Sequence, residues 1–590
     1  MKHNRIFALL LSLALLIGLC TGCAGDPVET GPSGTRTNDP TLSEALTAAS
    51  TESVAEATEP IPADVIPVRL QNGGWLRFLP EEPLSIPKLS EMVYTRPDAE
   101  PLRAALEALT EKVPEYSDVG ALLNDYAPIA QQIQHFSSMS GLAFYLYASD
   151  LSNSDYSAEY DYCNEQGDVL EEKLGALYAA FAASPCRDGL EKAYFNEGFF
   201  KDYDDFRSGD ETFLALKRQE NDLLLQYYAL AGTTDLDDYR QTEKNHHAFG
   251  QLLVELIKVR QKIATAKGYD SYMDYSYACD FQRDYSTAQA RTYLSSVKAL
   301  LAPLLQNSKI NGVYSYYSVW MESKAMEYLS SATEKMGGPI WESFRFLSGH
   351  KLYDIVEGAD KMATAYTSYL ADYEAPIIFV NPDAKDLIIA LFHEFGHDCD
   401  FYCNYGISGD YETGETYSQA MQYLAFAYAE PFSDRERTSN LRATLSDLLV
   451  ASVLKEGAYA DFELQIYALA PEELSVEKLD AIFGQCMEDY GVAGTFEAQF
   501  KNIYWSFYHH FFDYPGYVIS YSDSAVASLQ ICRLEAENPG AGVAAFKRLL
   551  HRTHAKKFSA VLAEAGLDSP FEEATLEKTA EFLKDAFDMN

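Results

Sequence analysis

The segment between residues 376 and 397 constrains the fold of this chain more than any other part of its sequence. A run of β-branched and aromatic residues at 377–380 follows a proline and predicts a buried strand, with which residues 362–369 could pair. Asn381 and Pro382 then give the N-cap and first-residue signals of a helix, and the residues that follow are mostly apolar. We therefore expect a small β element beside a buried helix.

The same helix carries the sequence His393-Glu394-Phe395-Gly396-His397. Residues four apart on an α-helix lie about 40° apart in azimuth, so both imidazoles point the same way and can bind one Zn²⁺ ion. Glu394 is offset from both histidines, where it can take a proton from water that the metal activates. Two histidines and a glutamate in an apolar helix need partners, so a metal site is favoured over hydrogen-bonded core histidines.

A catalytic zinc site needs a third protein ligand and keeps one position open. The acidic candidates after the motif are Asp398, Asp400, Asp410, Glu412, Glu415 and Glu430. The first two are poorly phased on the helix, whereas Glu415 begins a second predicted helix and Glu412 lies three residues before it. Glu412 could orient a ligand histidine, as could Asp386 at the start of the first helix, and spacing alone does not choose between Glu412 and Glu415 as the ligand.

These residues resemble the thimet oligopeptidase and oligoendopeptidase F family. In that family a Glu-x-x-Glu-x-x-Ser pattern follows the histidine motif, and its second glutamate is the third zinc ligand. The resemblance therefore implies that Glu415 binds one zinc ion together with His393 and His397, that Glu412 lies beside it, and that Glu394 is the general base. One departure is Gln422, because the family usually has a glutamate seven residues after the ligand.

The resemblance extends upstream and downstream of the motif. Residues 264–269 and 375–381 look like recurring family segments, the second of which lines the substrate site. Residues 510–521 match the pattern His-x-Phe-x-x-Pro-x-Tyr-x-Ile-x-Tyr. The match implies catalytic roles for His510, Tyr517 and Tyr521. Tyr517 is then the leading donor to the oxyanion, His510 and Tyr521 position substrate and intermediate, and His509 is an alternative to His510.

Helical periodicity dominates the chain from about residue 98, as in the leucines at 102, 106 and 109. Residues 68–78 predict a small hairpin, and Thr495 could cap a long helix that carries Phe500, Ile503 and Phe507. The family resemblance implies a mainly α fold, with two helical lobes around a deep substrate channel and a small β element beside the zinc helix. We expect four regions: a lipoprotein signal peptide at 1–22, a lipidated cysteine and flexible tether at 23–62, an N-terminal helical region at 63–205, and a metallopeptidase catalytic domain at 206–590.

The first residues predict export and a lipid anchor. Lys2 and Arg5 precede an apolar stretch at 6–19, which is too short to span a bilayer comfortably and fits the core of a signal peptide. Thr21 and Gly22 lead to Cys23, which resembles a bacterial lipoprotein processing site at which that cysteine is lipidated. We therefore expect the chain on the outer face of the bacterial cell membrane, held through its N-terminal lipid.

The net charge of the chain and the histidine motif together limit the possible functions. A net charge of −42 argues against nucleic acid as a partner, because phosphate binding requires clustered Lys and Arg. We expect zinc-dependent hydrolysis of peptide bonds in short, unstructured peptides. Two alternatives are a lipid-anchored peptide-binding protein, against which the intact Glu394 argues, and a peptidyl-dipeptidase resembling angiotensin-converting enzyme. A substrate with a blocked C-terminus distinguishes the latter, because only an endopeptidase cuts it.

Overall fold

A computed structural model describes residues 67–69, 75–78, 86–195, 199–203, 211–231, 239–307, 310, 322–362, 364–381, 387–406, 410–495, 500, 502–551 and 557–589. The predictions for residues 1–62, including the lipidated Cys23, and for Asp386 lie outside these described residues. Within the described residues, no helix combines the length and the apolar character needed to cross a membrane.

The N-terminal part of the chain forms a helical bundle. Its helices are α3 (Ala99–Lys112), α4 (Val119–Ser149), α5 (Ser154–Ala183) and α6 (Arg187–Ala193). Leu102, Leu106 and Leu109, which the sequence places on one face of α3, are all buried. Asp98 caps α3 and Asp118 caps α4, because each side chain accepts a hydrogen bond from a backbone N–H of the first turn. The predicted helical periodicity of this region is therefore confirmed.

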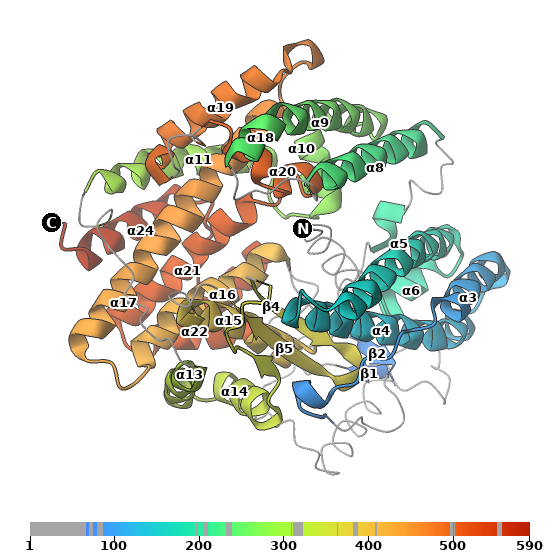
Figure 1. Cartoon of the computed structure of the whole chain (residues 1–590), viewed down its shortest axis with the longest axis horizontal. Coiled ribbons are helices and arrows are strands. Elements are labelled where there is room, and N and C mark those ends of the chain that lie inside the picture. The colour runs from blue at the N-terminus through green and yellow to red at the C-terminus, as the bar shows by residue number, and fades with distance from the viewer. Residues whose placement is uncertain are drawn as a thin grey trace.

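A second group of helices lies in the upper part of Figure 1 and is called the upper body here. Its members are α8 (Glu211–Ala231), α9 (Tyr239–Ala266), α10 (Tyr272–Tyr275), α11 (Thr287–Leu300), α18 (Gly457–Ile466), α19 (Val476–Asp489) and α20 (His510–Asp513). Apolar faces of these helices share one core, in which Ile257 of α9, Leu294 of α11 and Phe483 of α19 are fully buried.

A third group, called the lower body, contains the central helix that carries the histidine motif. Its helices are α13 (Glu322–Met336), α14 (Pro339–His350), α15 (Leu387–Asn404), α16 (Tyr411–Tyr428), α22 (Ala541–Leu550) and α23 (Phe558–Ala565). Figure 1 labels all of these helices except α23, and the labelled ones lie below the upper body and beside the N-terminal bundle. A separate core of buried residues fills this body, with Leu391 and Phe395 of α15 packed against Tyr417 and Leu424 of α16.

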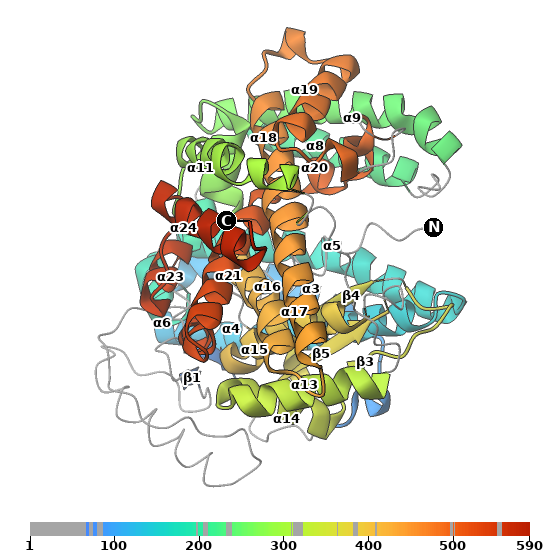
Figure 2. The same cartoon turned by 90° about the vertical axis from the view of Figure 1, so that its left-hand side faces the viewer.

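Three helices lie between the two bodies or run from one to the other. They are α17 (Asp434–Asp447), α21 (Ile519–Glu537) and α24 (Glu573–Ala586). Helix α17 continues through a π-helical segment, η9 (Leu448–Glu456), into α18, and Figure 2 shows this path from the lower to the upper body. Helix α21 belongs to both cores: Ala525, Val526 and Leu529 pack into the upper one, and Ala527 and Ile531 into the lower one.

The predicted β element is a three-stranded sheet with the order β3-β5-β4. Its strands are β3 (Tyr353–Asp354), β4 (Ala365–Leu370) and β5 (Ala375–Val380). The central strand β5 is parallel to β3 and antiparallel to β4, with Thr367 opposite Ile378. All six residues of β5 are buried, which explains the continuous apolar run in the sequence. The sheet packs against α15, so the expected β element beside the motif helix is confirmed.

The mainly α class is confirmed, and the deep channel between the bodies stays a prediction. The strands of the predicted hairpin are present as β1 (Pro67–Arg69) and β2 (Trp75–Phe78), which pair antiparallel. The long helix after Thr495 was a wrong prediction: in the described residues the chain forms a 3₁₀ turn at Tyr504–Phe507 and the short α20. Trp505 donates a hydrogen bond to Asp480 of α19, and such contacts override local helix propensity.

Candidate metal centre

Two helices bring the three predicted metal ligands together. Helix α15 carries His393 and His397, and α16 carries Glu415. The backbones approach closely at Gly396, where a Cβ atom would lie 2.4 Å from the carbonyl oxygen of Tyr417. Only glycine fits there without displacement, so the second variable position of the motif has a packing reason for its residue type.

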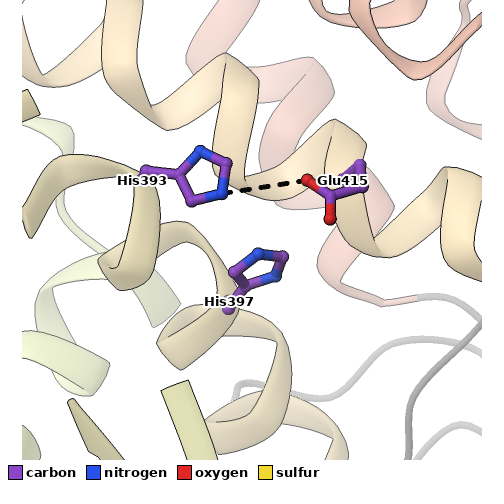
Figure 3. A group of neighbouring side chains, drawn as sticks. All are labelled: His393, His397 and Glu415. Atoms are coloured by element: carbon purple, nitrogen blue, oxygen red, sulfur yellow. Dashed lines mark ion pairs between the residues drawn. The ribbon is translucent and has the colours of Figure 1, made fainter. Parts of the chain in front are cut away.

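The donor atoms of these residues converge on one point. One donor atom from each of His393, His397 and Glu415 lies within 4.8 Å of the other two, and Figure 3 shows the three side chains pointing toward one another. The distance from His393 Nε2 to Glu415 Oε2 is 3.8 Å. Ligand atoms of a tetrahedral zinc ion lie roughly 3.4 Å apart, given bonds of about 2.1 Å. The arrangement therefore fits one ion after a small adjustment of side chains.

The electrostatics of the cluster also suit a divalent cation. Burial lowers the pKa of His393 to about 4 and that of His397 to about 3, so both imidazoles are neutral and their lone pairs are available at pH 7. Burial raises the pKa of Glu415 to about 7, against a hydrogen bond from Ser418 that lowers it. Among the described residues no lysine or arginine forms an ion pair with the largely covered Glu415 carboxylate, and a metal ion would supply the positive partner. Two nitrogens and one carboxylate oxygen are a donor set that zinc accepts.

Gln422 contacts the outer nitrogen of a predicted ligand. Its side-chain amide lies 2.9 Å from His393 Nδ1, on the side of the ring away from Glu415. The Gln422 atom at this distance is the amide nitrogen, so for His393 Nε2 to bind a metal the amide must turn and present its oxygen to a protonated Nδ1. Gln422 is thus the residue that holds the His393 ring, at the position where the sequence departs from the family pattern.

Glu394, the predicted general base, is held by the sheet. The Thr367 hydroxyl of β4 lies 2.8 Å from Glu394 Oε2 and 2.9 Å from the Glu394 carbonyl oxygen, and can donate to either. Burial raises the pKa of Glu394 to about 8, the Thr367 hydrogen bond lowers it, and the nearby charge of Glu415 raises it further. The sequence predicts that residues 362–369 pair with β5 but carries no signal that Thr367 contacts Glu394.

Glu412 accepts hydrogen bonds from three other side chains. Its Oε1 accepts hydrogen bonds from Arg283 Nε at 2.6 Å, from Tyr285 OH at 2.9 Å and from Ser520 Oγ at 3.0 Å. These hydrogen bonds join Glu412 to the three groups, while Gln422 lies within hydrogen-bonding distance of His393 Nδ1; the orienting role of Glu412 stays a prediction. The sequence could not show these contacts, because Arg283 is 129 residues away from Glu412.

The three residues assigned by the downstream resemblance lie together. The His510 ring stacks on Tyr517 at 5.0 Å between centroids, and the Tyr521 ring meets Tyr517 edge-on at 5.1 Å. Both tyrosines also lie near Glu415, one of the predicted ligands, whose charge adds to burial in raising the pKa of each. The Tyr411 ring, 4.8 Å from that of Tyr517, completes this side of the cluster and was not foreseen.

The two neighbouring histidines have different surroundings. His509 Nδ1 lies 3.3 Å from the Asp513 carboxylate, and its side chain is 31% exposed. The His510 ring faces Tyr517, and its buried Nδ1 atom has no hydrogen-bond partner in the described part of the chain. The structure thus places His510, rather than His509, beside the tyrosines.

Comparisons with known proteins cover most of the chain. A family model described as the peptidase M3 N-terminal domain matches residues 89–204, and one described as peptidase family M3 matches residues 340–581. Among curated proteins, none matches. Among solved structures, PZ peptidase A with an inhibitor is 20% identical with a TM-score of 0.71, and the match covers 85% of this chain and 99% of that one.

Two oligoendopeptidase F structures are also similar. One, from Bacillus anthracis str. Ames, is 20% identical with a TM-score of 0.68, over 86% of this chain and 99% of that one. The other, from Enterococcus faecium, is 14% identical with a TM-score of 0.51, over 83% of this chain and 97% of that one. At these identities the structures establish a shared fold.

Proposed function

The chain belongs to peptidase family M3, and from this premise we propose that it is a zinc-dependent oligoendopeptidase that cuts short, unstructured peptides. The observation that carries the proposal is the convergence of His393, His397 and Glu415 within 4.8 Å, with Glu394 on the same helix. The family supports peptide hydrolysis, and the donor set and the buried carboxylates support zinc.

The proposed roles follow from what each side chain can reach. Zinc held by His393, His397 and Glu415 would polarise the peptide carbonyl and make water more acidic. Glu394 takes the proton of the attacking water and delivers it to the departing amine. Without a cation, burial raises the pKa of Glu394 to about 8, and a zinc ion beside it would favour the ionised carboxylate that accepts the proton. Thr367 keeps the Glu394 carboxylate in place during both transfers.

The tyrosines are proposed to stabilise the negative charge that forms on the carbonyl oxygen. As water attacks, the carbonyl oxygen gains negative charge, and a hydroxyl donor beside it stabilises that charge. Tyr517 is the proposed donor, because burial and the neighbouring Glu415 hold its pKa well above its usual range and keep the hydroxyl protonated. His510 and Tyr521, which contact Tyr517, are proposed to position the substrate and the intermediate.

The first experiment separates zinc binding from proton transfer. Glu394→Gln should retain zinc and fold normally yet lose nearly all turnover of a fluorogenic peptide, because an amide cannot accept the proton. Glu415→Ala should instead lose zinc. The matched control is Glu357→Gln, which removes an exposed carboxylate. Near-normal turnover by Glu394→Gln, with contaminating peptidases excluded, would overturn the mechanism, and so would full zinc content in Glu415→Ala.

Two further substrates test the kind of peptidase. Peptides of about 5–20 residues should be cut and tightly folded proteins left intact, as the family resemblance implies. A peptide with an amidated C-terminus should be cut as fast as its free-acid counterpart. Cleavage of the free acid alone would favour the peptidyl-dipeptidase alternative. Tight peptide binding without cleavage by the zinc-loaded protein would favour the peptide-binding alternative.

We propose also that the peptidase is exported and anchored to the outer face of the cell membrane. The support is the sequence of residues 1–23, in which a basic start and an apolar stretch lead to Thr21-Gly22-Cys23. Cys23→Ser should release the protein from membranes or leave it unprocessed. Unchanged membrane association after complete signal cleavage would exclude a lipid on Cys23.

A further inference from the structure

The segment that carries the tyrosines, residues 512–521, is held through its backbone by side chains from residues 276–283 and from α18. Ser276 Oγ donates to the carbonyl oxygen of Pro515 at 2.8 Å, and Arg283 Nη1 donates to that of Gly516 at 2.8 Å. The Gly516 N–H in turn donates to Glu463 Oε1 at 2.9 Å. The residue that follows these bonded peptides is Tyr517, so its position depends on them.

Arg283 also binds the helix that carries the proposed ligand Glu415. Its Nε donates to Glu412 Oε1 at 2.6 Å, and its Nη2 donates to Ser520 Oγ at 2.7 Å. The Ser520 hydroxyl donates to the same Glu412 oxygen at 3.0 Å, which closes a ring of hydrogen bonds. The side chains of Arg283 and Glu412 are only 1% and 2% exposed, so water does not compete for these bonds.

One guanidinium group thus joins two parts of the proposed site that are far apart in sequence. Glu412 lies one turn before Glu415 on α16, and Gly516 directly precedes Tyr517. The planar guanidinium holds its donors in a fixed fork, so it sets the orientation of both parts as well as their separation.

We propose that Arg283 is a positioning residue for peptide hydrolysis, which fixes the Tyr517 hydroxyl relative to the metal ligand Glu415. This inference rests on the proposed function. It predicts that disturbing Arg283 impairs the stabilisation of the oxyanion more than it impairs the binding of substrate or zinc.

Arg283→Lys tests the fork directly. Lysine keeps the positive charge that pairs with Glu412, but a single ammonium cannot also hold Gly516 and Ser520 in the same geometry. We expect kcat to fall about 10–100-fold, because misplacing a catalytic group by about 1 Å has an effect of this size. KM and the zinc affinity, measured by competition with a chromophoric chelator, should change far less. Affinity for a phosphinic peptide, which mimics the tetrahedral intermediate, should fall in parallel with kcat.

Two further variants show whether a fall in kcat is caused by loss of the folded structure. Ser520→Ala removes one hydroxyl from the ring of hydrogen bonds and little volume, and it should lower kcat in the same manner but less. Arg548→Lys is the matched control: Arg548 Nε and Nη2 bind the carbonyl oxygen of Ala565, so the change weakens a guanidinium–backbone contact elsewhere. It should lower the melting temperature without lowering kcat. Normal kcat in folded Arg283→Lys or in Ser520→Ala would overturn the inference.

A double variant shows whether Arg283 acts through Tyr517. In a Tyr517→Phe background the hydroxyl to be positioned is already gone, so adding Arg283→Lys should reduce kcat little further. Losses that multiply in full would mean that Arg283 acts in another way. The outcomes separate failure of the inference from failure of the proposed function. If Glu394→Gln is inactive and Arg283→Lys has a normal kcat, only the role of Arg283 is rejected. If Glu394→Gln is active, the proposed function itself is rejected.

Discussion

Replacing Gly396 by alanine should separate the two helices that form the metal centre. The new Cβ would lie 2.4 Å from the Tyr417 carbonyl oxygen and 2.5 Å from the Ser418 Cα, both of which are backbone atoms of α16. Ordinary contact begins at 3.4 Å, so the shortfall is 3.4 − 2.4 = 1.0 Å. No flexible side chain can absorb it, and α15 and α16 must move apart by about that distance at this point.

Gly396→Ala should weaken zinc binding more than it lowers the stability of the fold. Metal–ligand distances tolerate about 0.2 Å, so a shift of about 1 Å between the histidines and Glu415 should weaken zinc binding at least about 100-fold. Overpacking costs about 1–3 kcal/mol, and alanine returns up to about 1 kcal/mol of helix propensity, so the net loss of stability is modest. Competition with a chromophoric chelator measures the first quantity, and denaturant unfolding of the metal-free protein measures the second.

Gly414 provides the control, because it lies on α16 one residue before Glu415 and a Cβ there would meet nothing within 4 Å. Gly414→Ala should bind zinc as the wild type does and should stabilise the helix by about 0.5–1 kcal/mol. If Gly396→Ala retains wild-type zinc affinity, the close approach of the two backbones is not what places Glu415. If Gly414→Ala loses zinc as well, the effect of Gly396→Ala has another origin.

Three further predictions follow from the site and its surroundings. Gln422→Leu should weaken zinc binding about 10–100-fold, because the His393 ring loses its outer partner. Gln422→Glu should strengthen it, and equal affinities in a chelator competition would contradict both expectations. Tyr517→Phe should lower kcat about 10²–10³-fold with zinc content and melting temperature unchanged. A change in KM alone would mean that Tyr517 only holds substrate. If Tyr517→Phe keeps a normal kcat and Tyr521→Phe is inactive, Tyr521 is the donor to the oxyanion. Burial raises the pKa of Glu463 from 4.5 to about 8, so the folded chain keeps a proton that the unfolded chain loses, and this group makes stability fall as pH rises through that window. The melting temperature of Glu463→Gln relative to that of the wild type should therefore be higher at pH 8 than at pH 5. If the melting temperatures of the two proteins change with pH in the same way, the effect is excluded.

Local sequence patterns predicted the parts of the site that lie on single elements. The spacing of His393 and His397 is set by the helical period, and the run that forms β5 is apolar because both faces of the strand are covered. The choice of Glu415 over Glu412 required the family resemblance. In the structure Glu415 is the glutamate whose carboxylate faces His393, at 3.8 Å.

Contacts between distant parts of the chain could not be read from the sequence. Gln422 was noticed as a departure from a pattern, but its contact with His393 depends on how α16 packs on α15. Arg283 carries no motif, because its three acceptors come together only in the folded chain. The misplaced helix after Thr495 has the same cause, since Trp505 takes its conformation from its hydrogen bond to α19 rather than from local propensity.

Helix α21 contributes residues to both hydrophobic cores, and this affects how the protein folds during and after synthesis. Residues of this one helix complete both the upper and the lower core, yet the helix begins only at Ile519 of a 590-residue chain. Neither core can close on a ribosome before nearly all of the chain has emerged, so the two bodies cannot fold one after the other as independent units. If the chain is exported as proposed, closing both cores late would delay folding until most of the polypeptide has crossed the membrane.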